Sequence, residues 1–142
     1  MTHATSQIPI LESSIRETYD WVDRMALELD EDDRHFALQA LRAGLHALRD
    51  HLTVEQSAHL SAQFPTFIRG LYFEQWTPGV PDPIRNLDDF FARIAYGLRG
   101  YQERCTPERA ARAVFAVLEE SLAGSGEKIR QTLPKPIRDL WD

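Results

Sequence analysis

The chain has 142 residues, 43% of them hydrophobic and 27% charged, which is enough for one domain with a core that needs no disulfide or metal. A net charge of −6 without a concentrated basic face excludes a nucleic-acid-binding protein, and the absence of any run of about 20 apolar residues excludes a membrane span. Because Cys105 is the only cysteine, a disulfide framework is also excluded, and we expect a soluble protein of the reducing cytoplasm.

Helical periodicity governs the first half of the chain. Apolar residues recur at steps of three and four over about 10–29, which predicts an amphipathic helix. Its stripe consists of Ile15, Tyr19, Val22, Ala26 and Leu29. We interpret the acidic run 30–33 as the first turn of a second helix over about 33–51, because carboxylates there oppose the positive end of the helix dipole. Leucines from Leu38 to Leu52 keep the same spacing and predict that this second helix lies in the core.

Two shorter helices and a break follow. The sequence 53–56 fits a capping box, in which the threonine hydroxyl and the glutamine side chain each accept from a free backbone N–H, so a helix begins there and ends near Gln63. Proline is tolerated at a helix start, so Pro65 predicts a fourth helix over about 65–75. Three prolines and a glycine in 77–83 then forbid a continuous helix.

The same order of elements returns after the prolines. A new apolar stripe consists of Leu87, Phe91, Ile94, Leu98 and Tyr101. Threonine and proline at 106–107 form a cap followed by a proline at the first helical position, and this helix is predicted to end near Gly124. We interpret Ser125 as the cap of a short helix, and Pro134 as the start of a last helix that ends at Trp141.

The second half of the chain repeats the first. The segment 20–26 is echoed by 89–95, and 64–72 is echoed by 133–141, both at a displacement of 69 residues. A unit of about 65 residues is marginal alone. We therefore predict an all-α fold of about eight helices, in two tandem four-helix repeats packed as one pseudo-twofold helical bundle. The single domain, 1–142, comprises repeat one over about 11–76, a proline-rich joint over 77–86 and repeat two over about 87–141.

The histidines are the first candidates for chemistry. His46, His51 and His59 lie close in sequence, with Glu55 nearby, and zinc needs three or four such ligands that converge. The predicted helix break at Thr53 separates them, and the chain contains no HExxH and no CxxC motif. We therefore assign no metal site and interpret these residues as surface or capping histidines.

Other reactive groups lack the neighbours that catalysis needs. The acidic pairs 88–89 and 119–120 hold adjacent residues, which point in different directions on a helix. Cys105 has arginines nearby but no histidine, and 124–126 lacks the spacing of a phosphate-binding loop. The sequence assigns no catalytic residue and no cofactor. It leaves open whether the protein is an enzyme, while favouring that it is not.

Three segments of repeat one, Leu41–Leu52, His59–Pro65 and Arg69–Trp76, carry a resemblance to a known family. Together they resemble the bacterial family called domain of unknown function 2267, and the likeness covers roughly 11–141, the duplication included. The resemblance implies a helical tandem repeat. It implies no catalytic, metal-binding or cofactor-binding residue.

Aromatic and arginine residues at the ends of the two repeats are the best remaining indication of function. Most of these aromatics are expected to lie in the core, but an unburied subset is predicted to anchor a partner protein, because such residues dominate interface hot spots. The candidate anchors are Arg69, Tyr72, Trp76, Arg138 and Trp141. We thus expect a non-enzymatic protein-interaction module that binds a protein partner or itself. The alternative is a small-ligand-binding or enzymatic protein with a site in the groove between the repeats.

The two repeats differ in ways that bear on this choice. The histidines of repeat one do not recur in repeat two. Residues 1–80 hold 12 acidic residues and 6 arginines, whereas residues 81–142 hold 10 acidic and 10 basic residues. We therefore expect the residues specific to function to lie on repeat one or on the seam between the repeats.

Overall fold

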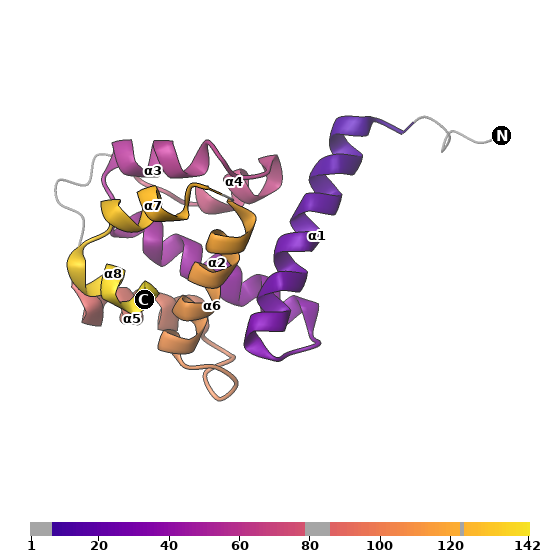
Figure 1. Cartoon of the computed structure of the whole chain (residues 1–142). Helices are drawn as coiled ribbons and strands as arrows, with labels where there is room; N and C mark the ends of the chain where they lie inside the picture. The colour runs from indigo at the N-terminus through magenta and orange to yellow at the C-terminus, as the bar shows by residue number, and fades with distance from the viewer. Residues whose placement is uncertain (1–6, 79–85, 123) are drawn as a thin grey trace.

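The computed structural model describes residues 7–78, 86–122 and 124–142 of the chain. Within these ranges it contains eight α-helices and no strand, which confirms the predicted all-α fold (Figure 1). The helices are α1 (Pro9–Leu29), α2 (Arg34–Asp50), α3 (Val54–Ser61), α4 (Thr66–Tyr72), α5 (Leu87–Gly97), α6 (Pro107–Ser121), α7 (Gly126–Thr132) and α8 (Lys135–Trp141). None of the helices so described is long and apolar enough to cross a membrane.

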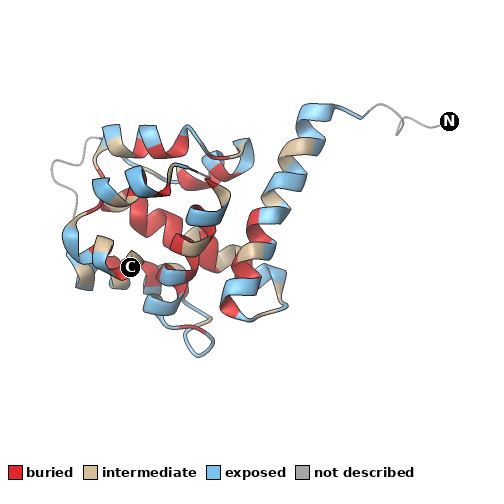
Figure 2. Cartoon of the chain, in the orientation of Figure 1, coloured by how far each residue is buried: buried red, intermediate tan, exposed pale blue. Residues whose placement is uncertain are grey.

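The core is built around α2, which packs against α1, α5 and α6 (Figure 2). Most of α2 is buried, and its small residues allow neighbouring helices to come close. A Cβ atom on Gly44 would lie 2.4 Å from a methyl group of Val114 in α6. A Cβ atom on Gly97, at the end of α5, would lie 2.6 Å from that of Ala43. The second predicted helix is therefore the central helix of the fold.

If α1, α2 and α4 are matched with α5, α6 and α8, each contact between two of these helices has a matching contact. α1 packs on α6 and α5 packs on α2, while α4 packs on α1 and α2 and α8 packs on α5 and α6. Arg24 in α1 donates to the hydroxyl of Ser121 in α6, and Arg93 in α5 donates to the carboxylate of Asp50 in α2. A duplicated unit predicts such pairs, and the pseudo-twofold axis stays a prediction.

Several predicted helix ends are present. Thr53 and Gln56 form the capping box with both of its hydrogen bonds, and the hydroxyl of Thr106 accepts from the backbone N–H of Arg109. Pro65 and Pro134 directly precede α4 and α8, as their position predicted. Most of the proline-rich joint, 79–85, lies outside the described residues.

Other predicted ends are wrong. The acidic run is not the first turn of α2, because Asp30 adopts a left-handed conformation that ends α1 and Asp33 is the cap that precedes α2. α4 ends at Tyr72 rather than near residue 75, where Gln75 has a positive φ of 55°. Tyr101 lies beyond the end of α5, and Gly100 at φ 94° follows that end. α6 ends at Ser121, and Ser125 precedes α7 without a capping bond from its side chain.

α1 is longer than α5, the helix at the matching place in the second half of the sequence. Thr18 stands 69 positions before Leu87, the first residue of α5, so α1 begins nine residues earlier than α5 does. The buried residues of α1 start at Trp21. Its N-terminal part to Asp20, together with the extended cap residue Ile8 that precedes the helix, projects away from most of the other helices, and Figure 2 shows it almost wholly exposed. We call this part the free half of α1.

Candidate functional site

A partly buried polar network joins α2 to the end of α4 and the turn that follows it. Arg42 donates two hydrogen bonds of 2.7 Å to the carboxylate of Glu74. His46 donates from Nε2 to the carbonyl of Leu71 at 2.8 Å, and the same nitrogen lies 3.6 Å from Glu74. Burial lowers the pKa of His46 below its usual value, and the nearby Arg49 lowers it further. The imidazole is therefore neutral at pH 7 and its Nε2 proton is already engaged.

The network continues through Arg49, which is 3% exposed. Its guanidinium donates to the backbone carbonyls of Tyr72 and Glu74 at 3.0 and 2.6 Å and to the carboxylate of Asp50 at 2.9 Å. Asp50 also accepts from Arg93 of α5 at 2.8 Å. Because these donors already have acceptors within the fold, the network holds α4 and α5 on α2 rather than offering a free group to a substrate.

The remaining histidines are dispersed. His51 is buried, donates from Nδ1 to the carbonyl of Ala47 at 2.8 Å and places its ring edge-on to Phe90 at 5.3 Å. His59 is exposed on α3, with its Nε2 3.9 Å from Glu55. His51 is the C-cap residue of α2, which agrees with the interpretation as a capping histidine. His46 is buried and is therefore not a surface histidine, although it bonds to a carbonyl in the last turn of α4. In the described part of the chain, no three His, Cys, Asp or Glu side chains are placed to hold a metal ion.

Two further titratable groups have shifted pKa values. Burial raises the pKa of the Cys105 thiol, which lies 3.3 Å from the carbonyl of Thr106, so the thiol is a poor nucleophile at pH 7. Burial raises the pKa of Glu28 in α1, and the neighbouring carboxylate of Glu120 in α6 raises it further. The sequence did not indicate this acidic pair, because Glu28 and Glu120 are brought together only by the packing of α1 on α6.

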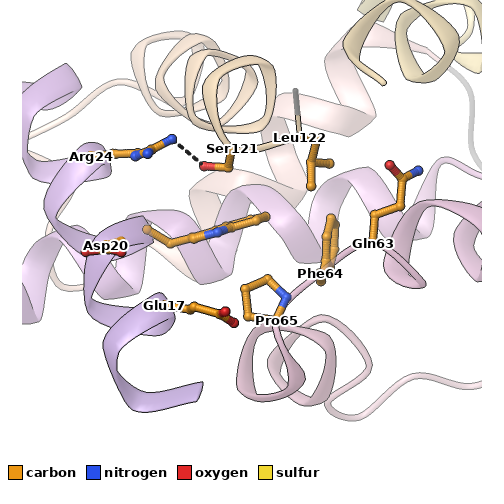
Figure 3. Close-up of a pocket in the computed structure, with 9 residues that line it drawn as sticks. Glu17, Asp20, Arg24, Gln63, Phe64, Pro65, Ser121 and Leu122 are labelled. Atoms are coloured by element: carbon orange, nitrogen blue, oxygen red, sulfur yellow. Dashed lines mark hydrogen bonds between the residues drawn. The ribbon is translucent and has the colours of Figure 1, made fainter. Parts of the chain in front are cut away.

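A pocket of about 350 Å³ lies where α1 meets the α3–α4 corner and the end of α6 (Figure 3). The rings of Trp21 and Phe64 meet edge to face beneath it, with centroids 5.3 Å apart. Both rings are less than 5% exposed, so they offer a ligand little apolar surface. Glu17 and Asp20 bring two carboxylates to the pocket from the free half of α1.

The polar side chains that line the pocket are those of Glu17, Asp20, Arg24, Gln63 and Ser121. Arg24 donates to the hydroxyl of Ser121 at 3.2 Å. The histidines and the cysteine do not line it. The pocket does lie on the seam between the two halves of the chain, where the sequence predicted that function-specific residues would lie.

Two of the five predicted anchors support the fold. Tyr72 is 0% exposed, and its hydroxyl is 2.9 Å from that of Ser57, so its ring cannot reach a partner. Arg69 donates to three carbonyls at the C-terminal end of α3, those of Ser61, Ala62 and Phe64. Its guanidinium bonds to that helix end although Arg69 is itself an exposed residue.

The other three predicted anchors are half-buried, so part of each side chain is accessible to solvent. Trp76 is half-buried against Phe73, with ring centroids 5.0 Å apart. Trp141 stacks on Phe115 at 4.8 Å, and its Nε1 donates to Glu119 at 3.2 Å. Arg138 is half-buried in α8. The structure does not gather the anchors into one patch, because α4 packs on α1 and α2 whereas α8 packs on α5, α6 and α7.

The free half of α1 carries a stripe of large apolar side chains that are each half exposed. They are Ile8 at 54%, Leu11 at 56%, Ile15 at 53% and Tyr19 at 50%. At 3.6 residues per turn, the four lie within an arc of about 80°. Arg34 of α2 covers one face of the Tyr19 ring at 4.7 Å and pairs with Asp23, which marks the boundary of the folded body. We call these four residues the α1 stripe.

The sequence pattern identified Ile15 and Tyr19, together with Val22, Ala26 and Leu29, as one face of an amphipathic helix, without separating the exposed from the buried part of that face. The heptad-like spacing is the same before and after Trp21, and nothing in the spacing tells where the body of the protein begins. Because α2 and α6 pack against the second half of α1, Ile15 and Tyr19 stay about half exposed, with Arg34 over one face of the Tyr19 ring.

Comparison with known proteins gives one family match. A search of curated proteins finds no match to the chain. A family model described as "Uncharacterized conserved protein (DUF2267)" matches residues 18–140. The matched residues begin at Thr18, so most of the free half of α1 precedes them. Since the match spans most of the sequence and agrees with the resemblance in the first repeat, the chain belongs to the DUF2267 family.

Proposed function

We propose that this protein is a cytoplasmic, non-enzymatic helical interaction module that binds another protein through the α1 stripe. The observation that carries the proposal is the exposure of four large apolar side chains in a row on a helix that projects from the body. Contiguous apolar surface of this kind marks interaction sites in folded proteins. Residues at positions i, i+3, i+7 and i+11 of a helix are also the usual anchors for a hydrophobic groove.

The buried histidine, arginine and cysteine side chains are bonded or neutral within the fold, and this supports a non-enzymatic role. The buried donors of His46 and Arg49 bond to backbone carbonyls, and the thiol of Cys105 is held neutral by burial. Trp76, Arg138 and Trp141 remain candidates for secondary contacts, because each keeps exposed surface. Arg69 also stays a candidate, because it is exposed while bonding to the end of α3, whereas Tyr72 is buried and serves the fold.

Affinity capture from the native cell with cross-linking tests the proposal. We expect Ile15→Glu to remove the captured partner, because a carboxylate in the middle of the stripe would have to be desolvated on binding. Ile10→Glu is the matched control, because Ile10 is 70% exposed on the same free half but lies about 140° around the helix from the stripe. Trp76→Ala and Trp141→Ala measure the secondary contacts.

Circular dichroism must show that every variant keeps its helices, so that a loss of capture reports binding and not folding. The proposal fails if Ile15→Glu captures its partner as well as the wild type does, or if Ile10→Glu loses the partner to the same extent.

The pocket at the seam supports a second candidate function, the binding of a small ligand. Its volume of about 350 Å³ falls within the range of known ligand pockets. A thermal-shift screen with divalent metals and common metabolites tests it. A large, saturable stabilisation that is lost in Asp20→Ala would favour ligand binding at the pocket, and its absence would leave the interaction role.

A further inference from the structure

We propose that the occupant of the α1 stripe is a second copy of this chain, which pairs its own free half of α1 antiparallel to the first. The proposal rests on the proposed function, since it names the partner of the same surface. The resulting dimer would have a twofold axis through the middle of the two free halves, so that one patch contacts itself.

The spacing of the apolar residues fits a helix pair. From Ile8 the steps alternate between three and four residues, which is the pattern of the a and d positions of a coiled coil. The series is Ile8, Leu11, Ile15, Thr18, Val22, Met25 and Leu29. The last three are buried against the body, whereas the first three stand in solvent. A second copy of the helix would present the matching row.

An antiparallel arrangement brings the stripes together without bringing the bodies together. With Leu11 opposite Ile15 of the second copy, Ile8 would lie opposite Thr18, and each folded body would stand at the far end of the other helix. Each chain carries a net charge of −6, so separated bodies repel each other less than the adjacent bodies of a parallel pair. The opposed helix dipoles favour the same orientation.

The charges beside the stripe are complementary in this arrangement. Glu12 and Arg16 lie on the same side of the stripe, one turn apart. Antiparallel pairing sets Glu12 of each chain near the level of Arg16 of the other, and the twofold axis repeats the pair. The free half lacks the row of Lys and Arg that attracts an interfacial helix to anionic lipid, so a membrane is the poorer occupant.

The size of the stripe sets the strength of the dimer. Four half-exposed large side chains present on the order of 400 Å² of apolar surface, and two copies with their flanking polar residues would bury roughly 1,000 Å². This total stands at the lower limit for specific interfaces. We therefore expect a reversible dimer that forms at micromolar or higher concentration, not an obligate one.

Sedimentation equilibrium of the full chain over micromolar to millimolar concentration tests the proposal. The apparent mass is expected to rise from 16.3 kDa toward twice that value as concentration increases. Leu11→Glu and Ile15→Glu should each hold the mass at the monomer value, whereas the off-stripe control Ile10→Glu should follow the wild type. A wild type that stays monomeric throughout, or an Ile10→Glu variant that loses the dimer equally, would overturn the proposal.

The orientation has its own test. In the double variant Ile8→Cys, Thr18→Cys, oxidation should link two chains, because antiparallel pairing places these residues opposite each other. The two positions are about 15 Å apart along one helix, so no disulfide can form within a chain. Ile8→Cys alone should cross-link far less, and efficient cross-linking of that single variant would overturn the antiparallel arrangement.

These results separate the two proposals. If the chain is monomeric at all concentrations but Ile15→Glu still abolishes capture of a different protein from the cell, the second-copy proposal fails and the proposed interaction module stands. If the stripe substitutions change neither the mass nor the capture, both fail.

Discussion

At the scale of single residues, the polar groups around α2 stabilise the fold only in particular protonation states. His46 must be neutral or a buried charge would face Arg49, which is itself 3% exposed. His51 is buried against Phe90, and burial lowers its pKa too, although Asp50 and Asp89 oppose that shift. The fold therefore contains two imidazoles that resist protonation, for the same physical reason.

Stability is expected to fall as the pH is lowered through the range in which free histidine titrates. In the unfolded chain both imidazoles take up protons near their ordinary pKa of 6.5, whereas in the folded chain their lowered pKa values keep them neutral to lower pH. Protons then bind preferentially to the unfolded state, so the stabilising contribution is complete above pH 6.5 and is lost progressively below it. Urea unfolding from about pH 7.5 to about pH 5.5 measures this loss, before most carboxylates titrate.

Substitutions of one buried and one exposed histidine serve as the test and the control for that experiment. His46→Gln keeps a donor for the carbonyl of Leu71 but cannot be protonated, and so should flatten part of the pH dependence. His59→Gln removes an exposed imidazole and controls for the loss of a histidine from the chain. A free energy of unfolding that stays constant or rises toward pH 5.5 would contradict the assignment.

At the scale of helices, the sequence predicts the elements that local chemistry determines. The capping box at Thr53 and the prolines before α4 and α8 act within a few residues of themselves, and the structure has them where they were predicted. Asp30 and Asp33 were misplaced because aspartate suits both a cap and a first turn, and the choice depends on where α1 ends. The α1 stripe was missed as a surface for a related reason, since its exposure depends on the lengths of neighbouring helices.

Close helix crossings make a prediction at this scale. Gly44→Ala should destabilise the fold by about 1–3 kcal/mol, because its Cβ would overlap the methyl group of Val114 and overpack the crossing of α2 and α6. Gly97→Ala should also destabilise, because its Cβ would lie 3.0 Å from the backbone Cα of Ala43, which cannot simply rotate away. Thermal or urea unfolding of each purified variant measures both effects.

Gly70 provides the matched control. It lies within α4, is exposed, and a Cβ there would meet nothing within 4 Å. Gly70→Ala is therefore expected to stabilise the protein by about 0.5–1 kcal/mol through helix propensity alone. Stabilisation by Gly44→Ala as well would mean that α2 and α6 are further apart than described.

At the scale of the whole molecule, the halves of the chain are interleaved. The long helices of each half pack on those of the other, α1 on α6 and α2 on α5, in addition to α1 on α2 and α5 on α6 within the halves. Arg93 and Asp50 join α5 to α2, and Arg24 and Ser121 join α1 to α6. The crossed packing of α1 on α6 and of α2 on α5 joins the two halves, and their origin by duplication stays a prediction from the sequence.

The crossed packing predicts how the chain behaves when it is cut. The fragments 1–78 and 79–142 should each lack a cooperative unfolding transition, because separation would expose the faces of α2 and α6 that are buried in the whole chain. Mixing them should restore helical circular dichroism and a single transition, since each fragment supplies the surface that the other lacks. Arg93→Ala in the second fragment should weaken this complementation, because Asp50 would lose its partner across the seam while remaining beside Arg49. Should 1–78 fold cooperatively by itself, the first half would be an independent domain, and the free half of α1 would belong to that domain rather than to a two-part bundle.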